Sequence, residues 1–317
     1  MKPLIILTGP TAVGKTDLSV KLAKSVNGEI ISADSIQVYK YMDVGSAKVT
    51  EREMDGVKHY LIDELYPDEE FNIFYFKEKA KQYMEEILSK GKIPIVSGGT
   101  GFYIQSLLYD VEFSIEDNNK EIRNNLEKIY EEKGAAYLHN MLREIDEESA
   151  AAIHENNIKR VIRAIEYFRI TGEKISEHNK RESNKNSPYL FKYYCLNMDR
   201  KLLYERINKR VDIMIENGLV EEVKKLLNMG YSKNLISMQG IGYKEIVSYL
   251  QNEMTLDEAI DTIKQETRRF AKRQLTWFRR EKNVEFINYE DYEFDKKRIL
   301  EYMINDINKM LEEKSNE

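Results

Sequence analysis

The sequence predicts an α/β fold, in which a P-loop parallel sheet is flanked by helices and interrupted by an all-helical insertion domain. The sheet is predicted because short apolar runs alternate with amphipathic helical segments, a pattern typical of parallel strands joined by right-handed crossovers. A phosphate-loop motif also follows the first apolar run directly. The insertion is predicted because no strand-like run occurs between about Ser114 and Tyr189. We therefore expect a catalytic core of residues 1–115 and 188–317 and an insertion of residues 116–187.

The expected strands are short runs of aliphatic and aromatic residues bounded by polar or glycine-rich segments. In chain order they cover residues 4–7, 29–34, 93–97, 189–196 and 284–288. The expected helices have apolar residues spaced three or four apart, which places them on one face. They cover residues 17–25, 72–89, 200–229 with a break at Gly218, 256–280 and 295–313, with another helix opened by Gly240 and Gly242.

Composition limits the possible classes of protein. The chain has 317 residues, 42% of them hydrophobic, which is enough to bury a substantial core. Its apolar runs are too short to span a bilayer, so we expect a cytoplasmic protein without a membrane partner. The single cysteine, Cys195, excludes an internal disulfide and a cysteine zinc cluster, so Mg²⁺ is the expected metal. The net charge of −6 leaves room for nucleic-acid binding only through local basic surfaces.

Residues 9–16 read GPTAVGKT, which fits the phosphate-binding pattern G-x-x-x-x-G-K-[ST]. The glycines let backbone N–H groups converge on an anion, and the N-terminus of the following helix adds partial positive charge. Lysine supplies a full charge for phosphate oxygens, and the threonine hydroxyl can hold Mg²⁺. The sequence therefore predicts a diphosphate or polyphosphate site with Thr16 as metal ligand. Its residues are Gly9, Pro10, Thr11, Ala12, Val13, Gly14, Lys15 and Thr16.

Three further groups are candidates for the same site. Asp34 ends the second strand, where its carboxylate could hold Mg²⁺, accept a proton or merely cap a turn. The Gly98 to Gly101 turn could offer Thr100 and backbone N–H groups to phosphates, or could be an ordinary turn from strand to helix. Arg206 and Arg210 share a helix face, so one of them could reach a diphosphate.

Two basic helix faces outside the phosphate loop indicate a polyanionic second substrate. In the insertion, Lys159, Arg160 and Arg163 share a face, whereas Val161 and Ile162 belong to the apolar side of the same helix. Near the end of the core, several basic residues accompany Phe270, Trp277 and Phe278 with no acidic residue among them. The ones we expect to bind nucleic acid are Arg268, Arg269, Lys272 and Arg273. The alternative is that both are ordinary solvated helix faces.

Taken together, seven segments closely resemble the tRNA dimethylallyltransferases, also called tRNA isopentenyltransferases. The segments are GPTAVGKT (9–16), ISADSIQVYKYMDVGSAK (31–48), HYLID (59–63), IPIVSGGTGFYI (93–104), RVIRAIE (160–166), GIGYKE (240–245) and RRFAKRQLTWFRR (268–280). They follow the family's order. The chain departs from the family at Ile36, where many members have arginine, and it resembles the bacterial type that has no C-terminal zinc finger.

The resemblance implies transfer of a dimethylallyl group from dimethylallyl diphosphate to the exocyclic N6 amine of the adenosine at tRNA position 37, just 3′ of the anticodon. It assigns the phosphate loop to the diphosphate leaving group, with Mg²⁺ as cofactor. Asp34 would be the general base, and Thr100 and Arg210 would stabilise developing negative charge. We expect the enzyme to act as a monomer. The residues implied to touch the tRNA anticodon loop are Asp34, Ser35, Ile36, Gln37, Thr100, Arg123, Lys159, Arg160, Val161, Ile162 and Arg163.

Two other enzyme classes also contain such a loop. A small-molecule P-loop kinase would explain the sheet and the loop, although it leaves the basic faces and the insertion without a role. An adenylate isopentenyltransferase would use a free nucleotide as acceptor and has a related loop and aspartate. A GTPase or ATPase that only binds RNA would require a base-specificity motif such as N-K-x-D, which the sequence lacks.

Overall fold

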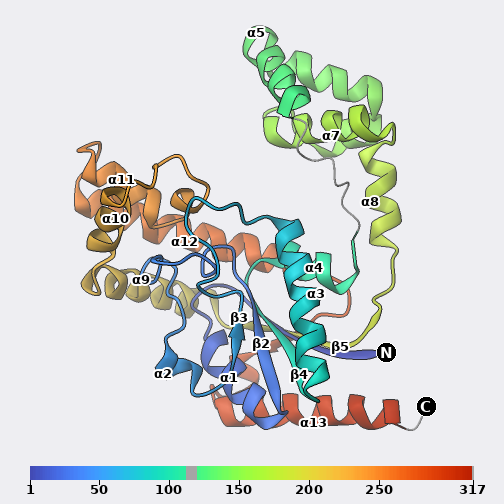
Figure 1. Ribbon diagram of the computed structural model, residues 1–317, viewed down its shortest axis with the longest axis vertical. Helices are drawn as coiled ribbons and strands as arrows, with labels where there is room; N and C mark the ends of the chain where they lie inside the picture. The colour runs from blue at the N-terminus through green and yellow to red at the C-terminus, as the bar shows by residue number, and fades with distance from the viewer. Residues whose placement is uncertain (112–119, 316–317) are drawn as a thin grey trace. The chain divides into compact units, whose positions relative to one another are not determined.

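A computed structural model describes residues 1–111 and 120–315 of the chain. The chain forms two compact units (Figure 1). The core unit consists of Met1–Leu108 and Pro188–Glu317, and the insertion unit consists of Tyr109–Ser187. In the described residues, no helix has both the length and the apolar character needed to cross a membrane.

The core unit is built on a six-stranded sheet in which all pairings are parallel, in the order β3-β2-β4-β1-β5-β6. Its central strand β1 is buried over most of its length because it lies between β4 and β5 and has helices over both faces. The predicted parallel sheet is therefore confirmed. The strands are β1 (Lys2–Thr8), β2 (Gly28–Ala33), β3 (His59–Tyr60), β4 (Ile93–Gly98), β5 (Tyr189–Asn197) and β6 (Glu285–Asn288).

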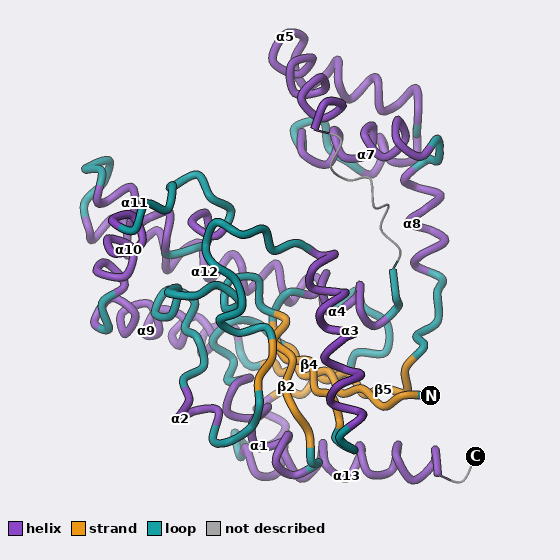
Figure 2. The backbone as a smooth tube through the Cα atoms, viewed as in Figure 1, coloured by secondary structure: helices purple, strands orange, loops and turns teal. Residues whose placement is uncertain are grey.

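The helices of the core unit surround this sheet (Figure 2). Helix α13 lies alongside α1 beneath the strands, and it buries Ile299, Met303 and Ile307 at the four-residue spacing of one helix face. The helices are α1 (Lys15–Ser25), α2 (Glu51–Met54), α3 (Ile73–Ser89), α4 (Gly101–Leu108), α9 (Arg200–Glu216), α10 (Leu219–Asn228), α11 (Tyr243–Leu250), α12 (Leu256–Phe278) and α13 (Lys296–Ser315), with short 3-10 turns at Ser237–Gln239 and Tyr289–Tyr292.

The insertion unit is entirely helical within its described residues. Its core joins α5 to α7 through residues such as Leu138, Leu142 and Ile165, all of which are fully buried. Helix α5 contains a break at Gly134, whose φ of 80° lies in the left-handed region that suits glycine. The helices are α5 (Lys120–Ile145), α6 (Glu147–Ala152), α7 (Ile158–Thr171) and α8 (Ile175–Ser183).

Two short elements were not predicted from the sequence. Strand β3 has two residues, too few to show an alternating pattern, and it is a strand only because it pairs with β2. Helix α2 has four residues and is held by a capping box between Thr50 and Glu53. Helix α1 begins at Lys15, two residues before the predicted start, because the end of the phosphate loop is already its first turn.

Candidate active site

The candidate site lies where three neighbouring strands end at one edge of the sheet. Strands β2, β4 and β1 are adjacent, and Gly98 pairs with Thr8 on one side and with Ala33 on the other. The loops that follow these strands therefore start at the same level. In parallel α/β sheets this carboxyl-terminal edge is where ligands bind. The phosphate loop, Asp34 and the Gly98 to Gly101 turn are thus brought together.

The phosphate loop leads from β1 into α1 through two glycines that other residues could not easily replace. Gly9 has a φ of 146°, and a Cβ there would lie 2.6 Å from the carbonyl oxygen of Leu196. Gly14 has a φ of 106° and forms the N-cap of α1. Between them Val13 is fully buried, so its side chain anchors the loop in the core rather than facing a ligand.

Lys15 crosses the mouth of this loop. Its Nζ donates hydrogen bonds of 2.9 Å to the carbonyl oxygens of Gly9 and Pro10. Burial and, to a smaller extent, the nearby Arg210 guanidinium lower the pKa of Lys15 to about 8, against an opposing effect of Asp34. Burial also lowers the pKa of Arg210. Burial thus disfavours the charged forms of both side chains, and an anionic ligand bound beside them would offset that cost.

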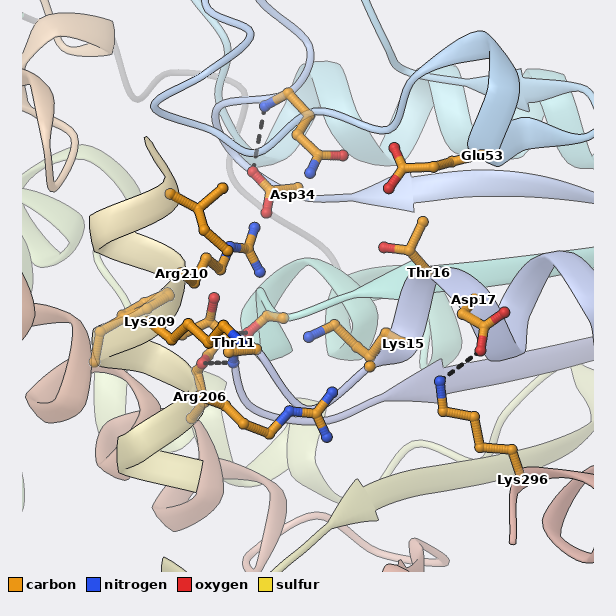
Figure 3. Close-up of a pocket in the computed structure, with 17 residues that line it drawn as sticks. Thr11, Lys15, Thr16, Asp17, Asp34, Glu53, Arg206, Lys209, Arg210 and Lys296 are labelled. Atoms are coloured by element: carbon orange, nitrogen blue, oxygen red, sulfur yellow. Dashed lines mark hydrogen bonds and ion pairs between the residues drawn. The ribbon is translucent and has the colours of Figure 1, made fainter. Parts of the chain in front are cut away.

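The loop opens into a cavity of about 430 Å³, which we call the cationic cavity (Figure 3). Its lining combines five basic side chains with three carboxylates, and the Lys296 ammonium lies 2.6 Å from the Asp17 carboxylate. The excess of cations suits a ligand with several negative charges. The charged residues of the lining are Lys15, Arg206, Lys209, Arg210, Lys296, Asp17, Asp34 and Glu53.

A second cavity of about 400 Å³ adjoins the first, and we call it the mixed cavity. Much of its lining is apolar, including Ile207, Met214 and Ile263. Ser35, Ile36, Thr100 and Arg273 also face it, whereas Gln37 faces the cationic cavity. The two cavities share the residues Thr11, Asp34, Gly99, Arg210, Phe270 and Gln274.

Asp34 is held at the junction of the cavities by an Asx turn. Its Oδ1 accepts hydrogen bonds from the backbone N–H groups of Ile36 at 2.9 Å and Gln37 at 3.3 Å. This arrangement fixes the carboxylate beside the guanidinium of Arg210 (Figure 3). Asp34 therefore does cap a turn, which is one of the roles that the sequence left open. The same turn places its carboxylate in the lining of both cavities.

Close packing accounts for the glycines of the second glycine turn. A Cβ on Gly98 would lie 2.3 Å from the carbonyl oxygen of Ala33, and one on Gly101 would lie 2.2 Å from the Trp277 ring. The backbone N–H of Thr100 donates to the carbonyl oxygen of Ala33 at 3.2 Å. Its amide is thus occupied, so only the Thr100 side chain remains to act in the mixed cavity.

The four basic residues of α12 that the sequence singles out divide into two pairs. Arg268 donates to Asn208 at 2.6 Å, and Arg269 lies 2.6 Å from Glu266 on its own helix. Lys272 and Arg273 are exposed, and within the described residues neither forms an ion pair. Of the four residues that the sequence singles out, Lys272 and Arg273 are the two whose charge is most available to a nucleic acid.

The basic face predicted in the insertion unit is likewise only partly exposed. Lys159 and Arg160 are exposed, whereas Val161 and Ile162 are buried in the core of the unit, which leaves their side chains no route to a ligand. The Nη2 atom of Arg123 lies 2.6 Å from the carboxylate of Glu166, and Arg163 lies 3.8 Å from the same oxygen. Arg123 and Arg163 are thus engaged with a buried charge of their own unit.

Several lining residues were missed by reasoning from the sequence. Lys296 begins the last helix, 279 positions after its partner Asp17, and nothing in its local sequence marks it. Glu53 belongs to the unpredicted helix α2, and Lys209 resembles any solvated lysine on a helix. Gln274 lies inside the basic run of α12, and nothing in the sequence distinguishes this uncharged residue from its neighbours.

The oxygen donors of the cationic cavity fit Mg²⁺. Thr16, Asp34 and Glu53 all line it, and the Thr16 hydroxyl and the Glu53 carboxylate face the same space in Figure 3. Mg²⁺ prefers oxygen ligands and is commonly held by one or two protein groups together with substrate phosphates. The described residues contain no cluster of three His, Cys, Asp or Glu side chains that could bind a metal ion.

Comparison with known proteins gives consistent results. A family model described as IPP transferase matches residues 37–281. The chain is 58% identical over 291 residues to the tRNA dimethylallyltransferase of Clostridioides difficile, covering 92% of this chain and 93% of that protein. It is 57% identical over 300 residues to the enzyme of the same name from Acetivibrio thermocellus, covering 94% and 96%.

Two solved structures are also similar. The tRNA isopentenylpyrophosphate transferase of Bacillus halodurans is 45% identical, with a TM-score of 0.75 over 100% of this chain and 99% of that one. A eukaryotic dimethylallyltransferase, described as acting on tRNA, is 29% identical, with a TM-score of 0.78 over 91% of this chain and 74% of that one.

Proposed function

This chain belongs to the IPP transferase family, and on that premise we propose that it transfers a dimethylallyl group from dimethylallyl diphosphate to tRNA. The acceptor is the exocyclic N6 amine of the adenosine at position 37, and diphosphate is released. The observation that carries this proposal is the junction of the two cavities, where Asp34 and Arg210 line both.

The cationic cavity suits the diphosphate. Gly14, Lys15 and Thr16 belong to the end of the loop that opens α1, where the helix terminus and the lysine both favour negative charge. Arg210 faces the same space and can stabilise the negative charge that accumulates on the leaving oxygen. Mg²⁺ held by Thr16 would neutralise part of the phosphate charge when bound.

The mixed cavity suits the adenine and the dimethylallyl group. Its apolar side chains can pack against both, and Asp34 lines this cavity as well as the cationic one, so its carboxylate can reach an amine bound at their junction. In the reaction the carbon–oxygen bond breaks and its electron pair leaves with the diphosphate. The amine nitrogen forms the new bond to carbon, and Asp34 accepts the proton that the nitrogen loses. An adenine inside a stack could not reach this carboxylate, so the base has to leave its stack.

The exposed basic residues suit the phosphate backbone of the tRNA. Lys272 and Arg273 continue the rim of the mixed cavity along α12, and Lys159 and Arg160 supply a second exposed pair in the insertion unit. Such contacts position a nucleic acid without reading its bases. We propose that the protein acts in this way as a monomer in the cytoplasm.

Donor specificity tests this proposal against a P-loop kinase. Purified protein with Mg²⁺ and unmodified tRNA should consume dimethylallyl diphosphate and release diphosphate without any requirement for ATP. If ATP is hydrolysed or donates phosphate while dimethylallyl diphosphate is left unchanged, the kinase interpretation replaces this one. Because free AMP could also enter the mixed cavity, AMP in place of tRNA tests the adenylate isopentenyltransferase alternative in the same assay.

A further inference from the structure

Gln274 is a buried polar residue on a helix otherwise notable for its exposed charges. It is 6% exposed and lies on α12 beside Lys272 and Arg273 in sequence, but on the opposite side of the helix from solvent. It lines both cavities of the candidate site. A buried amide is costly unless its donor and its acceptor are both satisfied, so its partners indicate its role.

The amide of Gln274 connects the two glycine turns of the site. Its Oε1 accepts a hydrogen bond of 2.9 Å from the backbone N–H of Thr11 in the phosphate loop. Its Nε2 donates a hydrogen bond of 3.0 Å to the carbonyl oxygen of Gly99 in the turn after β4. One side chain thus satisfies a donor on one loop and an acceptor on the other. Only an amide of this length offers both atoms, because a carboxylate lacks the donor and an ammonium lacks the acceptor.

Gly99 leaves the space that this contact needs. A Cβ added at Gly99 would lie 2.1 Å from Nε2 of Gln274, so any other residue would push the amide away. The φ of Gly99 lies outside the left-handed region, and the glycine is therefore explained by this close approach rather than by its own backbone conformation.

We propose that Gln274 is a positioning residue for the diphosphate site. By holding Thr11 and Gly99, it fixes the separation of the phosphate loop and the second turn, and it ties the helix that carries Lys272 and Arg273 to that loop. The N–H of Thr11 is bound to Gln274 and is therefore not available to a ligand. The diphosphate then binds the part of the loop from Gly14 to Thr16. This inference rests on the proposed function, since it concerns the diphosphate site.

Replacing Gln274 with methionine tests the role. Methionine has a similar length but cannot make either hydrogen bond. With Gln274→Met, calorimetry should show that inorganic diphosphate with Mg²⁺ binds about tenfold more weakly, the effect of losing about one such bond. The KM for dimethylallyl diphosphate should rise by a similar factor, while the Kd for tRNA should change less than twofold. Gln265→Met is the control, because Gln265 is exposed on the same helix and should bind diphosphate normally.

A second variant approaches the same contact from the other side. Gly99→Ala should displace the Gln274 amide and weaken diphosphate binding, but in a Gln274→Ala background it should cause no further loss, because there is no longer an amide to displace. An equal effect of Gly99→Ala in both backgrounds, or normal diphosphate affinity in folded Gln274→Met, would overturn the inference. If the wild-type protein binds no inorganic diphosphate, the proposed function fails, and this inference fails with it.

Discussion

Arg123 and Glu166 form an ion pair inside the insertion unit, although they are 43 residues apart in the sequence. The Nη2 atom of Arg123 lies 2.6 Å from a carboxylate whose side chain is 1% exposed, while the arginine itself is 45% exposed. The other oxygen of this carboxylate is buried and has no hydrogen-bond partner among the residues that the structure describes. Arg123 therefore neutralises a buried charge, whatever contact it also makes with tRNA.

Removing this arginine should destabilise the insertion unit. With Arg123→Ala we expect a loss of about 2 kcal/mol, less than the ~3–5 kcal/mol typical of breaking a fully buried pair, because Arg123 is partly exposed. Circular dichroism reports the helices of both units, so the loss should appear as an earlier phase of the denaturant unfolding curve. The fluorescence of Trp277, the single tryptophan, reports the core unit and should be unchanged. Equal destabilisation by both signals, or by neither, would argue against this role.

Replacing Asp34 with asparagine tests the general base. Asparagine keeps the shape and an oxygen for the Asx turn but cannot accept the amine proton. Single-turnover rates should fall by about 10²- to 10⁴-fold, the usual contribution of a positioned acid or base. Binding of tRNA, measured by filter binding, should change little. A near-normal single-turnover rate would remove Asp34 from the chemical step.

The lowered pKa of Lys15 predicts a pH dependence for diphosphate binding. In the free protein this pKa is about 8, so the ammonium is charged below that pH and loses its proton above it. Diphosphate prefers the charged form, so its affinity should be greatest below pH 8 and should fall by up to about tenfold per pH unit above it. In Lys15→Arg the guanidinium stays charged, and this part of the decline should disappear. Identical pH profiles would show that Lys15 does not titrate in this range.

The exposed pair on α12 can be tested separately from the chemistry. Replacing Lys272 and Arg273 with glutamine should weaken tRNA binding and make its logarithmic salt dependence shallower by about 0.7–0.9 for each lost phosphate contact. Affinity for dimethylallyl diphosphate should stay nearly constant. Lys309→Gln on α13 is the control, because it removes an exposed lysine from another helix. A salt slope equal to that of the wild type would show that Lys272 and Arg273 do not contact tRNA phosphates.

The parts of the fold that could be predicted are those determined by local pattern. Leu4 to Leu7 and Ile93 to Ser97 are apolar runs whose burial follows from composition, and the spacing from Gly9 to Thr16 identifies an anion-binding loop. Strand β3 could not be predicted, because it exists only through its pairing with β2. The reaction was predicted from the seven segments that resemble a known family, because motif spacing alone does not identify it.

The parts of the site that could not be predicted depend on contacts between distant residues. Gln274 is 263 positions from Thr11, and its role comes from burial and from two backbone partners that no local pattern reveals. The basic run on α12 was informative about charge, but it could not show that Arg269 is paired with Glu266 while Lys272 has no ion pair in the described part of the chain. The glycines of the Gly98 to Gly101 turn could not be assigned from the sequence, because close packing requires glycine just as an anion-binding turn does.

The central claim is that the acceptor is one adenosine of tRNA, and nucleoside analysis of the product tests it most directly. Unmodified tRNA with adenosine at position 37 is incubated with the protein, Mg²⁺ and dimethylallyl diphosphate, then digested and analysed by mass spectrometry. A matched tRNA with guanosine at position 37 serves as the control. We predict N6-dimethylallyladenosine from the first tRNA, none from the second, and little product when AMP replaces tRNA. Product formed on AMP but not on tRNA, or equally on both tRNAs, would contradict this account.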